Sequence, residues 1–368
     1  METNATSASP PPPPSGPPIA RASGSSSAPI AAKERITNLD TVRGVATLGI
    51  LVMNAVSFGL VDPAYFNLDA QGSNTWLDWV VGVTGEIFID QKTMALFSLL
   101  FGVGVVVFAD RAEAKGHRPG RLSMWRFALL LGIGLAHGVL WEGDVLQVYA
   151  VCAPVIFLVR RRDPKWLLGI GTALVMSSAA LAVALQPLIP ADGEGLSGYW
   201  FDDGGTMSDT VGLFLLNDFF VRSLGMMLIG VALYRFQIVQ GQRSREFYRR
   251  LAIGGLAIGL PFAIAGVALQ IANDFSADIA LSLEAPNTLA TIPMALGYLG
   301  LISMWNQRPA SNLQLRVRAV GRMALTNYIV HSVAGILFFR VILERGDASR
   351  SGIFVFILVV WALSLIHI

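Results

Sequence analysis

Long apolar segments recur along most of the chain, and short polar segments separate them. A bilayer core about 30 Å thick requires roughly 20 mostly apolar residues per helix. The segments of about this length predict spans at 42–61, 124–141, 144–160, 166–190, 211–235, 251–272, 286–305, 320–341 and 351–368, and 75–109 is a further, longer apolar region. Because the loops between them are short, the pattern predicts one all-α transmembrane bundle of about ten spans.

Charge is distributed unevenly between the loops. The N-terminal segment and the loops near 110–126, 160–165, 235–250 and 308–322 carry 22 of the 27 Lys and Arg, and the opposite loops carry acids. We call these two sides the basic face and the acidic face. Basic loops remain in the cytoplasm, so the pattern predicts a cytoplasmic N-terminus. It breaks only in the last loop, at Arg340, Arg345 and Arg350.

The region 75–109 is too long for one straight span. Two crossings would move the basic loop 110–126 to the acidic face, so the charge rule favours one net crossing. We expect Trp76 to Gly85 to lie on, or re-enter from, the acidic face, with the crossing over about 87–109.

The composition agrees with a lipid environment. Hydrophobic residues make up 54% of the chain and charged residues 14%, against about 45–50% and 25% in soluble domains. These values exclude an ordinary soluble enzyme, a disordered chain and a nucleic-acid binder, and predict the lipid bilayer as a partner. The single cysteine, Cys152, excludes an internal disulfide and a cysteine-based zinc site.

The chain divides into three parts. Residues 1–34 are rich in Pro, Ser and Ala and predict a disordered cytoplasmic tail. We expect 35–200 and 201–368 to form two transmembrane halves.

The last six residues, LSLIHI, match one reading frame of a transposase-type sequencing adapter. We therefore expect the native chain to continue past Ala362; the alternative is a genuine short tail.

Ionisable and amide side chains interrupt the apolar segments. Such groups are costly in a membrane and by default mark function. The candidates are Asn54, Glu86, Asp90, Lys92, His137, Asp144, Asp218, Arg222, Asn327 and His331. Most of them belong to the half of the bilayer nearer the acidic face, which predicts a polar cavity open to that side.

Several of these residues also have a purely structural interpretation. Asp218 and Arg222 are spaced i,i+4 and can neutralise each other, and Lys92 can act as counter-ion to the i,i+4 pair of Glu86 and Asp90. The pair Asn327 and His331 can simply hydrogen-bond between helices.

Two further features of the sequence bear on which residues could form a functional site: pairs of glycines, and the absence of known catalytic motifs. The pairs Gly134 and Gly138, and Gly255 and Gly259, predict close helix packing rather than sites. The sequence has no Walker loop, dinucleotide fingerprint, HExxH or GxSxG motif. No metal site is predicted.

Four stretches carry a family resemblance: NLDTVRGVATLGILVMN (38–54), FSLLFGVG (97–104), LAHGVLWEGDVLQVYA (135–150) and GRMALTNYIVHS (321–332). They resemble the YeiB-like family of bacterial inner-membrane proteins, and the last resembles its C-terminal domain of unknown function, number 418. The resemblance implies a multi-pass protein of the bacterial cytoplasmic membrane, with transport as one suggested activity.

A more distant likeness concerns the LDxxRG start, which contains Asp40 and Arg43. It resembles membrane acyltransferases of the heparan glucosaminide acetyltransferase and acyltransferase-3 groups, which implies acyl-CoA as donor and an acceptor across the membrane. The latter group has an essential His eleven residues after the Arg, where this chain has Asn54. An amide cannot act as a general base. His137 could take that role, with Asp144 orienting its ring; alternatively, Asp40 and Arg43 form a simple i,i+3 pair at the cytoplasmic end.

Three functions therefore compete. The first is an acyltransferase, with acyl-CoA phosphates at the basic face near Arg43 and an envelope glycan or lipid as acceptor. The second is a transporter for a small metabolite, which would use the same polar residues; no inverted repeat is evident. The third is a structural protein of the envelope. The sequence names no substrate and no oligomeric state.

Overall fold

The computed structural model describes residues 36–190 and 193–366, which are helical and contain no β-strand. The expected tail at 1–34 and the end of the LSLIHI segment lie outside these residues. The helices are α1 (Thr37–Gly59), α2 (Trp76–Phe88), α3 (Lys92–Ala114), α4 (Pro119–Leu140), α5 (Leu146–Val159), α6 (Pro164–Leu185), α7 (Asp209–Arg235), α8 (Arg245–Ala272), α9 (Glu284–Asn306), α10 (Asn312–Arg322), α11 (Ala324–Ile336) and α12 (Arg350–Ile366).

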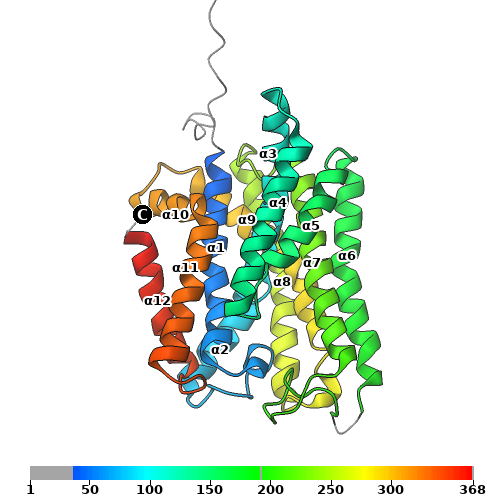
Figure 1. Ribbon diagram of the computed structural model, residues 1–368, viewed down its shortest axis with the longest axis vertical. Coiled ribbons are helices and arrows are strands. Elements are labelled where there is room, and N and C mark those ends of the chain that lie inside the picture. The colour runs from blue at the N-terminus through cyan, green and yellow to red at the C-terminus, as the bar shows by residue number, and fades with distance from the viewer. Residues whose placement is uncertain (1–35, 191–192, 367–368) are drawn as a thin grey trace, which may run out of the picture. The chain divides into compact units, whose positions relative to one another are not determined.

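The expected all-α membrane bundle is confirmed. Eight helical segments in the described part are long and apolar enough to cross a bilayer, and α5 and α12 are shorter apolar helices. The expected count of ten includes these two. The helices lie side by side in Figure 1. α3 packs against α1, α5, α7 and α9, and its buried side chains form part of the shared core. Large apolar side chains cover the outside, among them Val139 at 86% exposure. That apolar surface faces lipid.

The region 75–109 forms two helices rather than one. Gln91, with φ of 57°, lies at the break between α2 and α3. At the start of α2, Thr75 and Asp78 form a capping box. Asp78 also accepts a hydrogen bond from the Ser351 backbone N–H, which places this end of α2 at the acidic end of α12. At the far end of α3, Asp110 pairs with Arg235 at the basic face. The two helices together therefore make one net crossing, as expected.

The arginines that break the charge pattern have structural partners at the acidic face. Arg345 pairs with Asp62. Arg350 is 4% exposed and donates to Ala64 O at 2.8 Å and Ser73 Oγ at 2.9 Å. Two of the three exceptions therefore bind the loop that follows α1.

The expected span 320–341 begins differently. α10 ends at Arg322, α11 begins at Ala324, and a π-helical turn follows over Leu337–Ile342. α10 begins after a capping box, in which the side chains of Ser311 and Gln314 each accept a hydrogen bond from the other's backbone N–H. The box lies in the basic loop 308–322, four residues past Gln307, where α9 ends. α10 then packs along the basic end of α1.

The predicted glycine packing is confirmed. A Cβ added at Gly255 of α8 would lie 2.4 Å from Pro293 O of α9, and one at Gly134 of α4 would lie 2.9 Å from the Gln147 backbone nitrogen of α5. In both pairs the missing side chain lets two helix backbones approach closely.

Candidate functional site

His137 and Asp144 form a buried pair where α4 turns into α5. α4 ends as the backbone becomes extended at Trp141, and a short turn returns the chain to α5. The turn places His137 Nδ1 2.8 Å from Asp144 Oδ1, with His137 only 4% exposed. The Gln147 backbone N–H donates to the second carboxylate oxygen at 3.2 Å, and the Tyr328 hydroxyl of α11 donates to the first at 3.3 Å.

The other ring nitrogen of His137, Nε2, is buried and is left without a hydrogen bond in the described part of the chain. The rings of Tyr328 and Trp141 lie with their centroids 5.3 and 6.0 Å from the imidazole. A carboxylate that accepts from Nδ1–H leaves the lone pair on Nε2. This arrangement can act as a general base toward a group that reaches Nε2.

A second group of residues, which we call the buried polar cluster, joins the α2–α3 break to α7 and α9. Its members are Tyr65, Glu86, Asp90, Gln91, Lys92, Tyr199, Asp218, Arg222, Glu284 and Asn287. Asn287 links two of them: its amide donates to Asp90 Oδ2 at 2.8 Å, and its carbonyl oxygen accepts from the fully buried Lys92. Lys92 also donates to the Glu86 backbone carbonyl at 2.6 Å.

Arg222 binds the cluster to α7. It pairs with Asp218 at 2.6 Å, as the i,i+4 spacing predicted, and also donates to Gln91. Gln91 in turn donates to Glu284 at 2.8 Å. The Ser178 hydroxyl of α6 donates to Asp218. Three helices and the α2–α3 break therefore share one network.

The cluster carries more acid than base. Four carboxyl groups (Glu86, Asp90, Asp218 and Glu284) face three cations: Lys92 and Arg222 within the cluster, and Arg350, which acts on Glu86 from outside it. Because buried charges must be paired or neutralised, the imbalance favours proton uptake or a bound cationic group. No group of three or more metal-ligating side chains occurs among the described residues.

Two members of the cluster, Tyr65 and Tyr199, come from loops at the acidic face. Burial and the neighbouring carboxylates of Asp90 and Glu86 raise the pKa of the Tyr65 hydroxyl well above its usual value. Burial and Glu284 have the same effect on the pKa of Tyr199, whose hydroxyl lies 3.4 Å from a Glu284 oxygen. Both therefore remain neutral hydrogen-bond donors.

Other predicted residues lie apart from both groups. Asn54 is half-buried and makes no side-chain hydrogen bond within the described residues. Asn327 donates to Met323 O at 3.1 Å and so stabilises the break between α10 and α11. His331 bonds Ser364 of α12 at 2.9 Å. The structure thus gives Asn327 and His331 local roles between neighbouring helices.

At the basic face, Arg43 lies 3.5 Å from Asp40, the i,i+3 pair expected on structural grounds. α10 covers this end of α1, and Arg318 donates to Thr41 Oγ1 at 3.2 Å and to Asn306 at 2.5 Å. Arg43 thus belongs to a polar, cationic junction between α1 and α10.

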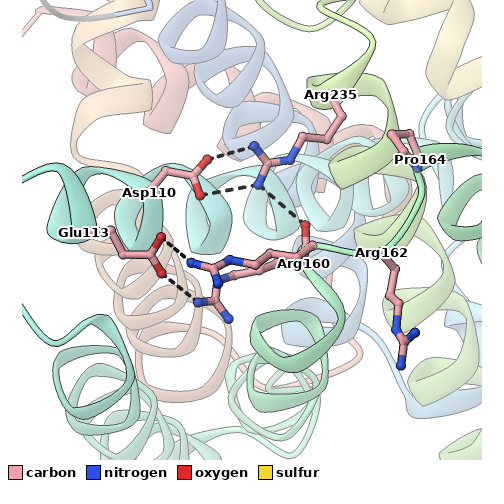
Figure 2. Close-up of a pocket in the computed structure, with 7 residues that line it drawn as sticks. Asp110, Glu113, Arg160, Arg162, Pro164 and Arg235 are labelled. Atoms are coloured by element: carbon pink, nitrogen blue, oxygen red, sulfur yellow. Dashed lines mark hydrogen bonds and ion pairs between the residues drawn. The ribbon is translucent and has the colours of Figure 1, made fainter.

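A pocket of about 430 Å³ also opens at the basic face. Its lining, which we call the arginine pocket, comes from the ends of α3, α5 and α7 and the start of α6: Asp110, Glu113, Arg160, Arg161, Arg162, Pro164 and Arg235. Figure 2 shows the two carboxylates engaged by arginines.

Sequence reasoning missed several members of these groups. Glu284 and Asn287 could have been found together, because two polar residues spaced i,i+3 lie on one helix face at the start of the expected span 286–305. Gln91 lies between Asp90 and Lys92, which are both candidates from the sequence. Tyr328 carries no comparable signal, since an aromatic residue in an apolar helix is ordinary. Only the tertiary position of α11, which packs against α1, brings its hydroxyl to Asp144.

Comparison with known proteins assigns the chain. Residues 233–367 match the family described as "Protein of unknown function (DUF418)". The "Uncharacterized protein YeiB" of Escherichia coli (strain K12) is 32% identical over 352 residues, which cover 89% of each chain. The chain belongs to the YeiB-like family. The "Uncharacterized protein YxaH" of Bacillus subtilis (strain 168) is 29% identical over 342 residues, 84% of this chain and 82% of the relative. The likeness to this family therefore extends well beyond the C-terminal match, across most of the bundle.

Proposed function

We propose that the protein is an acyltransferase of the bacterial cytoplasmic membrane, which transfers an acyl group from acyl-CoA to a hydroxyl of an envelope glycan or lipid at the acidic face. The observation that carries the proposal is the state of His137: Asp144 holds Nδ1 at 2.8 Å, while Nε2 is buried and unpartnered. This is the geometry of an oriented general base.

The reaction assigns one role to each nitrogen. Nε2 accepts the proton of the acceptor hydroxyl as its oxygen attacks the acyl carbon. The thioester C–S bond then breaks, and the leaving thiolate takes the proton from Nε2, so the imidazole returns to its neutral form. Asp144 stabilises the transient imidazolium without taking its proton. Tyr328 is a positioning residue, because it reaches the reaction only through Asp144.

The donor end of the path is the junction of α1 and α10. Arg43 and Arg318 supply guanidinium groups there, and phosphates of the donor bind such groups well. The acceptor end is the acidic face, where His137 lies at the close of α4. The acyl carbonyl has to reach the depth of His137 for transfer to occur.

Transport of a small metabolite is the second candidate, and the buried polar cluster favours it. Lys92 and Arg222 are buried between α3, α7 and α9 with an excess of carboxyl groups. Ionisable groups placed in this way in other membrane proteins bind substrates or relay protons. In an acyltransferase the same cluster would bind the acceptor.

A deletion strain separates the two functions. Its envelope lipids and glycans are compared by mass spectrometry with those of the parent and of the complemented strain. Loss of an acyl increment that complementation restores supports the enzyme. Unchanged envelope chemistry together with a defect in uptake or export supports the transporter and overturns the first proposal.

A further inference from the structure

The arginine pocket carries an excess of positive charge. Four guanidinium groups face two carboxylates, which leaves two positive charges without a counter-ion in the pocket lining. Asp110 is occupied by Arg235, with N–O distances of 3.0 and 3.3 Å. Glu113 is occupied by Arg160 at 2.8 Å and Arg161 at 2.7 Å. Both oxygens of each acid are therefore engaged by arginines, while the arginines have donors to spare.

The spare donors are identifiable. The Arg162 side chain has no ion-pair or hydrogen-bond partner in the described part of the chain, and in Figure 2 its guanidinium points away from the two carboxylates and toward the edge of the pocket. Arg161 is 70% exposed and binds Glu113 through one nitrogen, so its other N–H groups have no partner among the described residues either. A guanidinium binds phosphate oxygens through two parallel hydrogen bonds. The pocket thus presents a phosphate with donors that no other group uses.

Apolar side chains next to the pocket place it at the membrane surface. Leu158, two residues before Arg160, is 76% exposed, and Trp166, two residues after Pro164, is 48% exposed. Exposed tryptophan is typical of the interface between hydrocarbon and headgroups. The pocket volume of about 430 Å³ is within the range of ligand sites, about 300–1,000 Å³. We propose that the arginine pocket binds the phosphate of an anionic phospholipid in the leaflet at the basic face. This site is separate from His137 and does not depend on the proposed reaction.

The test uses the full chain in nanodiscs of phosphatidylcholine, alone or with phosphatidylglycerol. Phosphatidylglycerol is expected to raise the melting temperature and to remain bound in native mass spectra. Arg162→Gln should weaken its binding about fivefold, the effect expected for one cationic side chain at a membrane surface. Arg308→Gln is the matched control, because Arg308 is an exposed arginine of the same face with no side-chain partner among the described residues. It should bind the lipid like the wild type.

Three results would overturn the proposal. Equal losses in Arg162→Gln and Arg308→Gln would mean that the whole basic face attracts anionic lipid. No stabilisation of the wild type by phosphatidylglycerol would remove the site. Full stabilisation by inorganic phosphate added to pure phosphatidylcholine nanodiscs would identify a soluble anion, not a lipid, as the occupant. The double variant Arg161→Gln with Arg162→Gln, folded in phosphatidylcholine alone, should lose still more lipid than the single variant.

Discussion

His137 Nδ1 lies 2.8 Å from Asp144 Oδ1, across the turn that joins α4 to α5. The acid is fixed in its turn by the Gln147 backbone and by the Tyr328 hydroxyl from α11. A carboxylate held by two other donors can orient an imidazole without moving when charge develops on the ring. The pair therefore combines a local turn with one distant contact.

Asp144→Asn should lower acyl transfer by about 10²–10⁴-fold, the usual contribution of a general base. The amide can donate to Nδ1 and so favours the tautomer whose Nε2 carries the proton, which cannot accept another. The measurement is the acyl content of the envelope in a complemented deletion strain, normalised to the protein in the membrane. Tyr328→Phe is the comparison, because it removes one hydrogen bond and keeps the pair. Equal losses in both variants would contradict the assigned roles.

Lys92→Met should destabilise the fold by about 3–5 kcal/mol, the range seen when one partner of a buried charge pair is removed. Asn287 loses its donor, and the acid excess of the buried polar cluster rises. Unfolding in detergent measures the effect, and adding Asp90→Asn should recover part of the loss. Lys115→Met, at an exposed position, should stay near the wild type. If Lys92→Met and Lys115→Met have the same free energy of unfolding, the charge of Lys92 does not stabilise the buried polar cluster.

Gly321→Ala should destabilise the junction of α1 and α10 by about 1–3 kcal/mol. A Cβ there would lie 1.9 Å from Asp40 O, so the two helices must separate. Gly254→Ala is the matched control in α8, where an added Cβ meets nothing within 4 Å. Alanine favours a helix over glycine by about 1 kcal/mol, so this variant should be neutral or slightly more stable. The measurement is the thermal unfolding temperature of both variants. A Gly321→Ala protein as stable as the wild type would argue against close packing of α1 on α10.

The orientation of the bundle has its own test. A reporter that works only outside the cytoplasm should be active when fused after Gly195, at the acidic face, and silent when fused after Arg161, at the basic face. The positive-inside rule gives this expectation. The reverse pattern would invert every assignment of donor and acceptor sides.

The sequence alone was sufficient to predict the helical segments and the side-chain pairs between residues close together in the chain. Spacing alone predicted the Asp218–Arg222 and Asp40–Arg43 pairs, because i,i+3 and i,i+4 side chains share a helix face. It could not predict that Asn287 joins Lys92 to Asp90, since 195 residues separate Asn287 from Lys92. Arg345 and Arg350 depart from the charge pattern, and each binds the loop after α1, a contact that the charge rule does not predict. Distant polar contacts depend on how helices pack, and apolar periodicity does not specify that packing.

The most direct test of the acyltransferase proposal is the envelope acyl content of a deletion strain that carries either the wild-type chain or His137→Gln, at equal amounts in the membrane. Glutamine keeps polarity and approximate size but cannot accept a proton at neutral pH. The account predicts that mass spectrometry finds the acyl increment restored by the wild type and absent with His137→Gln. Equal restoration by the two chains would contradict it.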